Sequence, residues 1–385
     1  MRVLITTPSG LGHVLPMVPL ARAIHARGHD VRWATAADTM SVVEAAGLPA
    51  IAAGMDQHDR FPEFWRRHPE VRDLPASQVP DVMFPKMFGG IAAPVMLADL
   101  LAVVRDWPPD LVVHDAAELA APIVAAKQGA PSVVKAFGAV VPPNRVAAAA
   151  EEVAPLWRSL DLEPRPFAGC YDHLYLDVYP PSLQGLAADH IERRQLLRPV
   201  AYDVAAGEVG EVPLPRSRPD RPLVYLTMGT AFNDADTLRH AVDAIAALDV
   251  RLLVTVGPSG DPARLGDQPD HVVVERYVPQ TLVFEHCHVV ASHGGSGTAL
   301  AALHAGIPQL CLPQGADQFR NAAAITTCGA GLQLAPDAAT GPAIADAIAR
   351  LLEEPAFRTA AVGLSEAITA MPSPDDVAAV LEQLV

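Results

Sequence analysis

The sequence predicts an α/β protein made of two domains, each built around a parallel β-sheet. The chain has 385 residues, of which 50% are apolar and 19% charged, enough to bury the cores of two domains of ordinary size. Short β-rich apolar runs alternate with helical patterns, which is typical of βαβ units. The alternation stops at residues 212–222, where four prolines and four charges indicate an extended linker. We therefore expect domains at 1–211 and 223–385 that enclose a cleft.

In the first domain, the apolar runs predict strands and the longer periodic segments predict helices. Residues 54–80 lack clear periodicity and hold several aromatic and methionine side chains. We interpret this stretch as a long loop, a feature that is often functional. The expected strands are Arg2–Thr6, Val31–Thr35, Leu111–His114 and Ser132–Phe137, and the expected helices lie near Leu15–Ala26, Val82–Arg105 and Leu119–Gln128.

The same alternation resumes in the second domain. Residues 286–316 contain no acidic or basic side chain other than histidine, but glycines and prolines interrupt them, so we expect two buried strands around a short helix and no membrane span. Whether the last helix packs back on the first domain is left open. The expected strands are Leu223–Thr227, Arg251–Val256, Val272–Glu275, Val289–Ala291 and Gln309–Leu312, and the expected helices are Asp236–Leu248, Thr298–Ala305 and Asp375–Leu384.

The composition argues against several classes of partner. The formal net charge of −16 disfavours nucleic acid and anionic membrane surfaces, since both reward a basic patch. The four cysteines are far apart and form no CxxC pair, so neither a disulfide framework nor a structural zinc site is expected. With a strand expected from Arg2, we expect no signal peptide and a cytoplasmic protein. A homodimer is left open.

The loop after the first strand, residues 6–16, is the first candidate site. Gly10 and Gly12 have GxG spacing, but Leu15 stands where a dinucleotide fingerprint needs its third glycine, which argues against a nicotinamide dehydrogenase. His13 stands at the start of a helix, where an imidazole can act as a base near neutral pH. The alternative is a polar loop histidine or a helix cap. Ser9, in the same loop, is a further candidate site residue.

Asp115 follows the strand that ends at His114, on the same sheet edge as the first loop. A carboxylate there could hold a neutral histidine in its useful tautomer and stabilise the imidazolium that forms later. A plain N-cap aspartate is the alternative, and His114 and Glu118 compete for the orienting role.

The strongest candidate is the glycine-rich loop that follows strand Val289–Ala291. Its open backbone amides, its hydroxyls and the helix N-terminus behind it would form an anion site, although no lysine follows as in a Walker loop. A second loop, at Gly229 and Thr230, lies on the same edge, and two such loops suit a diphosphate. Ordinary tight turns are the alternative. The residues of the main loop are His293, Gly294, Gly295, Ser296, Gly297 and Thr298.

A fourth loop contains Asp317, Gln318 and Asn321 just before a helix. Adjacent carboxylate and amide groups suit the vicinal hydroxyls of a sugar, with helix capping as the alternative. No HExxH, GxSxG or Cys/His nucleophile pattern is present in the sequence.

Together these segments resemble family 1 glycosyltransferases of the GT-B fold, and more narrowly the bacterial enzymes that decorate antibiotics and other natural products. The resemblance covers essentially the whole chain. It rests on SGLGHVLPMVPLARAIHARGHDV (9–31), PDLVVHD (109–115), RYVPQ (276–280) and ASHGGSGTALAALHAGIPQLCLPQGADQFRNA (291–322).

The resemblance implies two Rossmann-like domains facing each other across a cleft, with the acceptor in the first and the nucleotide sugar in the second. His13 matches the family's catalytic base, and Asp115 matches the aspartate that orients it. Gly229, Thr230 and the 293–298 loop match the diphosphate ligands. The positions that match the nucleobase site are Tyr277, Val278 and Gln280, and those that match the donor-sugar site are Asp317 and Gln318.

The implied reaction is inverting sugar transfer from a nucleotide sugar to an acceptor hydroxyl, with no metal and no other cofactor. Ala301 stands where plant members carry a glutamate that grips the ribose hydroxyls, which suits a deoxyribose and hence a dTDP-linked sugar. For the acceptor, we expect a hydrophobic aglycone against an apolar set whose alternative role is ordinary core packing. That set is Met55, Phe84, Met87, Phe88 and Phe137.

Two rival functions remain open on the sequence. A sugar-nucleotide 2-epimerase of the same fold would need no acceptor, and the apolar acceptor region and the first loop favour transfer over it. A non-catalytic partner that activates a true transferase would be expected to have lost catalytic or donor residues. His13, Asp115 and His293 are all present, which favours an enzyme.

Overall fold

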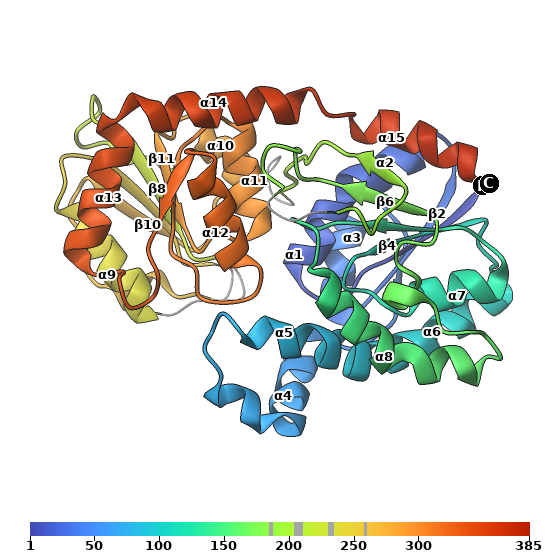
Figure 1. Cartoon of the computed structure of the whole chain (residues 1–385). Coiled ribbons are helices and arrows are strands. Elements are labelled where there is room, and N and C mark those ends of the chain that lie inside the picture. Colours follow the sequence, from blue (N-terminus) through green and yellow to red (C-terminus); the bar gives the residue numbers. More distant parts are fainter. Residues whose placement is uncertain (185–187, 204–210, 230–234, 258–259) are drawn as a thin grey trace. The chain divides into compact units, whose positions relative to one another are not determined.

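The computed structural model describes all residues except 185–187, 204–210, 230–234 and 258–259 (Figure 1). The chain divides into two compact units. Unit 1 comprises 1–179, 186–202 and 371–385, and unit 2 comprises 180–185 and 203–370. The segment 212–222, expected as an extended linker, belongs to unit 2, because Val212 and Leu214 pack against a core of that unit.

Unit 1 is built on a seven-stranded parallel sheet of order β3-β2-β1-β4-β5-β6-β7. The central strands are apolar and buried, and they lie where the periodicity placed them. Strands β3, β6 and β7 were not expected: β3 and β7 are the two edge strands and are only partly buried, whereas β6 lies inside the sheet between β5 and β7. The bounds are β1 Arg2–Thr6, β2 Asp30–Thr35, β3 Ala50–Ala52, β4 Leu111–Asp115, β5 Ser132–Lys135, β6 Leu174–Asp177 and β7 Arg194–Leu196.

The main helices of unit 1 include three that the sequence did not indicate, α3, α4 and α8. The last helix of the chain, α15, belongs to unit 1 and packs against α2 (Figure 1). The bounds are α1 Leu11–Val14, α2 Val18–Ala26, α3 Met40–Ala45, α4 Gln57–Arg67, α5 Val79–Met83, the π-helix η4 Phe84–Ala92, α6 Ala93–Asp106, α7 Ala121–Gln128, α8 Pro143–Ser159 and α15 Pro374–Leu381.

The interpretation of residues 54–80 as a long loop was wrong. Helix α4 occupies much of this stretch, followed by a short helical turn at Pro69–Asp73. The apolar positions Phe61, Phe64 and Trp65 have helical spacing and pack in one cluster. Pro62 inside the helix and the charged residues around it hid this period in the sequence.

Unit 2 is a six-stranded parallel sheet of order β10-β9-β8-β11-β12-β13. Alternate residues of its strands face two cores. Val224 and Leu226 face the core completed by α9 and α13, whereas Leu223 and Tyr225 face the core completed by α10 and α11. The strands are β8 Leu223–Thr227, β9 Arg251–Thr255, β10 Val272–Glu275, β11 Val289–Ser292, β12 Gln309–Cys311 and β13 Gly331–Gln333. The helices are α9 Ala235–Ala246, α10 Gln280–Phe284, α11 Ser296–His304, α12 Gln318–Thr327, α13 Gly341–Glu353 and α14 Pro355–Thr369.

Two apolar stretches bear on the question of a membrane. Residues 286–316 fold as β11, α11 and β12, which confirms two buried strands around a short helix. The helical run Val79–Asp106 is long and apolar enough to cross a membrane by length and composition alone, with 56% of its most apolar window buried inside the protein. That degree of burial is typical of a core helix.

In both sheets, the strand order reverses direction between two neighbouring strands whose following loops carry the predicted site residues. In unit 1 these strands are β1 and β4, with Thr6 beside His114. In unit 2 they are β8 and β11, with Thr227 beside Ser292. Ligands of open parallel sheets bind beyond the carboxyl ends of the strands at such a reversal. The topology therefore brings each pair of predicted loops together.

Candidate active site

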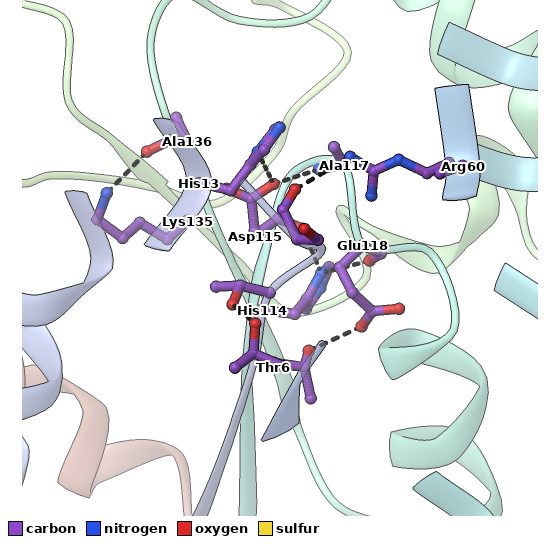
Figure 2. Close-up of polar contacts among 12 residues, drawn as sticks. Thr6, His13, Arg60, His114, Asp115, Ala117, Glu118, Lys135 and Ala136 are labelled. Carbon is purple, nitrogen blue, oxygen red and sulfur yellow. Dashed lines mark hydrogen bonds and ion pairs between the residues drawn. The ribbon is translucent and has the colours of Figure 1, made fainter. Parts of the chain in front are cut away.

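His13 and Asp115 meet at the carboxyl edge of the first sheet (Figure 2). His13 lies in the short helix α1 after β1, and Asp115 is the last residue of β4. The ring Nδ1 lies 3.0 Å from Asp115 Oδ1, which also accepts a hydrogen bond of 2.8 Å from the Ala117 amide. The side chains are 18% and 3% exposed. A carboxylate at Nδ1 favours the tautomer that leaves Nε2 as a proton acceptor.

The other two candidates for the orienting role face elsewhere. Adjacent strand residues point to opposite sides, so His114 turns away from His13 and its Nδ1 donates to the backbone oxygens of Asp115 and Glu118. Burial lowers the pKa of His114 to about 4. Glu118 accepts from the Thr6 hydroxyl and from the Ala120 and Ala121 amides (Figure 2). Burial raises the pKa of Glu118 to about 7.

Two aromatic rings flank His13. Phe88 and Phe137 contact the imidazole edge-on, with ring centroids 5.7 and 5.1 Å away. Phe88 also lines a small pocket of unit 1 that is partly open to solvent and has a cavity volume of about 10 Å³, room for a group the size of one water molecule. The pocket is mostly apolar, as expected for a site that takes an apolar ligand. Its lining includes Pro8, Gly54, Met55, Arg60, Phe88, Ala92, Ala93, Met96, Ala117, Glu118 and Leu119.

The predicted acceptor residues divide into two groups. Met55 and Phe88 line the pocket, and Phe137 lies against His13. Phe84 contacts Phe88, with ring centroids 5.5 Å apart, and is only 8% exposed. Met87, 3% exposed, packs in the core cluster of Phe64 and is not part of the lining. Some side chains of this set therefore line the pocket, and others pack in the core.

Two buried cations, Lys135 and Arg60, lie near Asp115, and no sequence pattern marks either of them as a site residue. Lys135, at the end of β5, donates 2.9 Å to the Ala136 oxygen, and burial lowers its pKa to about 8. Arg60, on α4, is 2% exposed and donates 3.0 Å to the Ser9 oxygen. In Figure 2 these two side chains lie on opposite sides of Asp115. Arg60 had no sequence signal, because it fell in the stretch interpreted as a loop.

The first loop is held by contacts of its own. Ser9 is buried, donates to Asp38 at 2.6 Å and accepts 2.9 Å from the Gln57 amide, so it ties the loop to the start of α4. Gly10 has a φ of 120°, and a Cβ there would lie 2.9 Å from Gln57 Oε1, which explains the glycine. A Cβ at Gly12 would meet nothing within 4 Å.

In unit 2, His293 is enclosed by two of the predicted glycines. A Cβ at Gly229 would lie 2.4 Å from His293 Cε1, and one at Gly295 would lie 2.4 Å from His293 Nε2. No larger residue fits at either position without moving the ring. Desolvation lowers the pKa of His293 to about 4, and its Nδ1 has no hydrogen-bond partner among the residues that the structure describes. A neutral imidazole can still donate one hydrogen bond to a phosphate oxygen. Thr230 lies outside the described residues.

The expected anion site lies at the N-terminus of α11. Gly295 is the N-cap of this helix, and among the described residues no side chain accepts from the first amides, those of Ser296, Gly297 and Thr298. Gly294 adopts a positive φ of 80°, which turns the chain into this helix. Unfilled amide donors and the helix dipole favour an anion here.

The predicted donor-sugar residues are partly occupied by their own loops. Asp317 Oδ2 accepts from the Ser296 hydroxyl at 2.5 Å and from Asn321 Nδ2 at 2.9 Å. Gln318 is 2% exposed, and its side-chain oxygen accepts from the amides of Gln314 and Gly315. Asp317 thus links the fourth loop to the 293–298 loop, and Gln318 shapes the turn before α12.

The predicted nucleobase segment lies at the start of α10. The Tyr277 ring is 40% exposed, and its hydroxyl donates 2.9 Å to Asp203 Oδ1. The Val278 side chain is buried in a core, so only its backbone can face a ligand. Gln280 Nε2 donates 3.1 Å to the Thr298 hydroxyl, which joins this segment to the anion loop.

Among the described residues, one group of side chains is close enough to hold a metal ion: Asp56, His58 and Asp59. His58 and Asp59 are exposed, and Asp56 Oδ1 already accepts from the Asp38 amide. Exposed acidic groups of this kind are common without a metal, so the cluster does not indicate a metal centre.

Comparison with known proteins places this geometry in context. A family model described as "Erythromycin biosynthesis protein CIII-like" matches through its N-terminal domain at residues 22–206 and through its C-terminal domain at 239–384. The chain is 34% identical to the elloramycin glycosyltransferase ElmGT of Streptomyces olivaceus, over 98% of this chain and 96% of that protein. It is 35% identical to the L-demethylnoviosyl transferase of Streptomyces niveus, over 88% and 86%.

Among solved structures, the spinosyn rhamnosyltransferase SpnG is similar over the full length of both chains, with a TM-score of 0.82 and 29% identity. Structures of SpnG in complex with thymidine diphosphate and with spinosyn aglycone match with TM-scores of 0.81 and 0.80.

Proposed function

This chain belongs to the EryCIII-like family of bacterial natural-product glycosyltransferases, has the GT-B fold and is a nucleotide-sugar-dependent glycosyltransferase, and from that premise we propose its substrates and mechanism. We infer that it transfers a deoxysugar from a dTDP-linked donor to a hydroxyl of a hydrophobic aglycone. The observation that carries this proposal is the His13–Asp115 pair beside a largely apolar pocket.

His13 acts as the general base in this proposal. Asp115 holds the proton on Nδ1, so Nε2 takes the proton of the acceptor hydroxyl. The acceptor oxygen then forms a bond to the anomeric carbon as the bond between that carbon and the diphosphate breaks. The bonding electrons leave with the nucleotide, and attack from the opposite face inverts the configuration. Asp115 stabilises the imidazolium that results.

The donor's diphosphate is proposed to bind at the N-terminus of α11. The uncapped amides of residues 296–298 and the neutral His293 supply donors aimed at oxygens whose charge grows as the bond breaks. These groups would stabilise the leaving nucleotide without a metal ion. We propose Gly229, Thr230 and the 293–298 loop as the diphosphate ligands, with Tyr277, Val278 and Gln280 at the base and Asp317 and Gln318 at the sugar.

A thymidine nucleotide is favoured over a uridine nucleotide. Ala301 lies one turn into α11 and partly buried, and its methyl group offers no acceptor for a ribose hydroxyl. SpnG, which is similar over its full length, has been solved with thymidine diphosphate. The proposal also places the reaction in the cytoplasm and leaves a homodimer open.

The base assignment is tested with His13→Ala and Asp115→Asn, using a dTDP-deoxysugar, a panel of hydroxylated polycyclic aglycones and detection of the glycoside by mass spectrometry. Loss of a general base costs on the order of 100- to 10,000-fold in kcat. We expect a loss in that range for His13→Ala and a smaller one for Asp115→Asn, with thymidine diphosphate affinity unchanged. His25→Ala, on an exposed position of α2, is the matched control and should retain full turnover. Normal turnover of His13→Ala would refute its role as the base.

A further inference from the structure

Arg60 is a buried cation in an otherwise mostly apolar wall. It lines the unit 1 pocket together with Met55, Phe88 and Met96, and only 2% of its surface is exposed. Its guanidinium carbon lies 5.1 Å from the centre of the Phe88 ring. A buried guanidinium is costly unless its charge and its N–H donors are compensated.

The protein compensates this guanidinium only in part. Nη2 donates to the Ser9 oxygen, but Nε has no hydrogen-bond partner within the described parts of the chain. No ion pair within 4.0 Å involves Arg60 among the residues that the structure describes, and the nearby carboxylates of Asp38 and Asp115 act on it only through space. Burial outweighs their attraction and lowers the pKa of Arg60 to about 10, so the guanidinium remains charged at neutral pH.

The neighbouring carboxylates are already engaged by other donors. Asp115 accepts from His13 and the Ala117 amide, and Glu118 accepts from Thr6 and the two amides at the start of α7. Asp38 accepts from Ser9 and the Gln57 amide. Among the described residues, Arg60 is therefore a cation at this pocket without an ion-pair partner, and an anionic ligand in the pocket could supply one.

We propose that Arg60 is a specificity-determining residue that recognises an anionic oxygen, a carboxylate or an ionised phenol, on the aglycone. This inference rests on the proposed function, in which the pocket holds the acceptor. An anionic oxygen would accept from the planar donor fork of the guanidinium, an interaction stronger than a neutral hydrogen bond. Phe88 contacts both Arg60 and His13, so an acceptor anchored there lies next to the base.

The test compares two flat, fluorescent probes that differ in charge, anthracene carboxylate and anthracene carboxamide, each titrated into the full chain at pH 7. We expect the wild type to bind the carboxylate more tightly. Arg60→Met should weaken carboxylate binding by about tenfold or more, as for loss of a charge-assisted hydrogen bond, and leave the carboxamide within about twofold. Arg66→Met is the matched control, because Arg66 lies on the same helix but is exposed and paired with Glu63.

A repeat at pH 7 with a nitrophenol acidic enough to be ionised at that pH and with a phenol that is neutral at that pH separates the two sources of the anion, because Arg60 keeps its charge at pH 7. Equal loss of both probes in Arg60→Met, or equal affinity of both probes for the wild type, would overturn the proposal. The wild-type comparison stands even if the variant does not fold. Thymidine diphosphate titration distinguishes the two hypotheses: charge selectivity without nucleotide binding would sink the proposed function, whereas nucleotide binding without charge selectivity would sink only the role of Arg60.

Discussion

At the scale of single residues, the site depends on small groups that hold larger ones in place. Asp115 orients the His13 ring through one hydrogen bond of 3.0 Å. Gly229 and Gly295 leave space for the His293 ring on two sides, where any Cβ would overlap it. In each case the neighbour decides which atoms of the histidine face a ligand. The position of each histidine ring therefore depends on the small groups beside it.

Gly295→Ala tests this dependence in the donor unit. The added Cβ would lie 2.4 Å from His293 Nε2, so the ring must move and one phosphate donor is displaced. We expect thymidine diphosphate affinity to fall by about tenfold, as for a lost hydrogen bond to a charged group. Gly363→Ala on α14 is the control, since a Cβ there meets nothing within 4 Å and alanine favours a helix by up to about 1 kcal/mol. Affinity is measured by calorimetric titration, and equal affinity of both variants for thymidine diphosphate would show that the position of His293 does not depend on Gly295.

At the scale of elements, two helices of unit 1 carry residues of the proposed acceptor site, and a third supports the unit. The π-helix η4 carries Phe84, Met87 and Phe88, and its wide turns place Phe88 at the pocket and Met87 in the core. Helix α4 carries Arg60. Helix α15 returns to unit 1 and packs against α2, the helix that follows the His13 segment. The last helix is therefore structural support for the N-terminal unit.

Leu381→Ala measures how firmly α15 is held. Leu381 is fully buried, whereas the nearby pairs of Arg27 and His29 with Glu382 lie at the surface, where ion pairs contribute little. We expect the free energy of unfolding to fall by about 2–4 kcal/mol, the range for such a cavity. The exposed neighbour Gln383→Ala should change it by less than about 0.5 kcal/mol. A similar small effect for both, in chemical denaturation, would mean that α15 is dispensable.

At the scale of the whole molecule, two parallel sheets follow the same topological rule and carry different chemistry. Unit 1 combines the His13–Asp115 pair with a mostly apolar pocket, and unit 2 combines the amides at the start of α11 with the neutral His293. Transfer requires ligands of both kinds. Because the proposed ligands of the nucleotide all lie in unit 2, the effects of nucleotide binding should be concentrated there.

Titration with thymidine diphosphate and uridine diphosphate in EDTA tests the donor and the proposed independence of metal together. We expect thymidine diphosphate to bind more tightly, with no loss of affinity on removal of metal. At a ligand concentration of about 100 times Kd, binding stabilises the folded state by about 2.7 kcal/mol. Hydrogen exchange should slow at residues 293–298 and not around the unit 1 pocket. Tighter uridine diphosphate binding would reject the thymidine preference, and restoration by Mg²⁺ would reject metal independence.

Much of the sheet architecture could be predicted from periodicity, because the central strands are continuous apolar runs. The partly buried edge strands β3 and β7 and the interior strand β6 were not predicted. Helix α4 was obscured by Pro62 and its charged residues. The meeting of His13 with Asp115 followed from one expectation, that loops after parallel strands share an edge.

Local features can be predicted from the sequence alone: the alternation that makes two parallel sheets, the glycines that turn the chain into α11, and the motifs that place the chain in its family. Which side chains contact each other depends on the tertiary structure. It selected Asp115 over His114 and Glu118 as the partner of His13, placed Met87 in the core, and buried Arg60 beside Phe88. Local rules act between residues a few positions apart, whereas these contacts join residues far apart in the chain and depend on how whole elements pack.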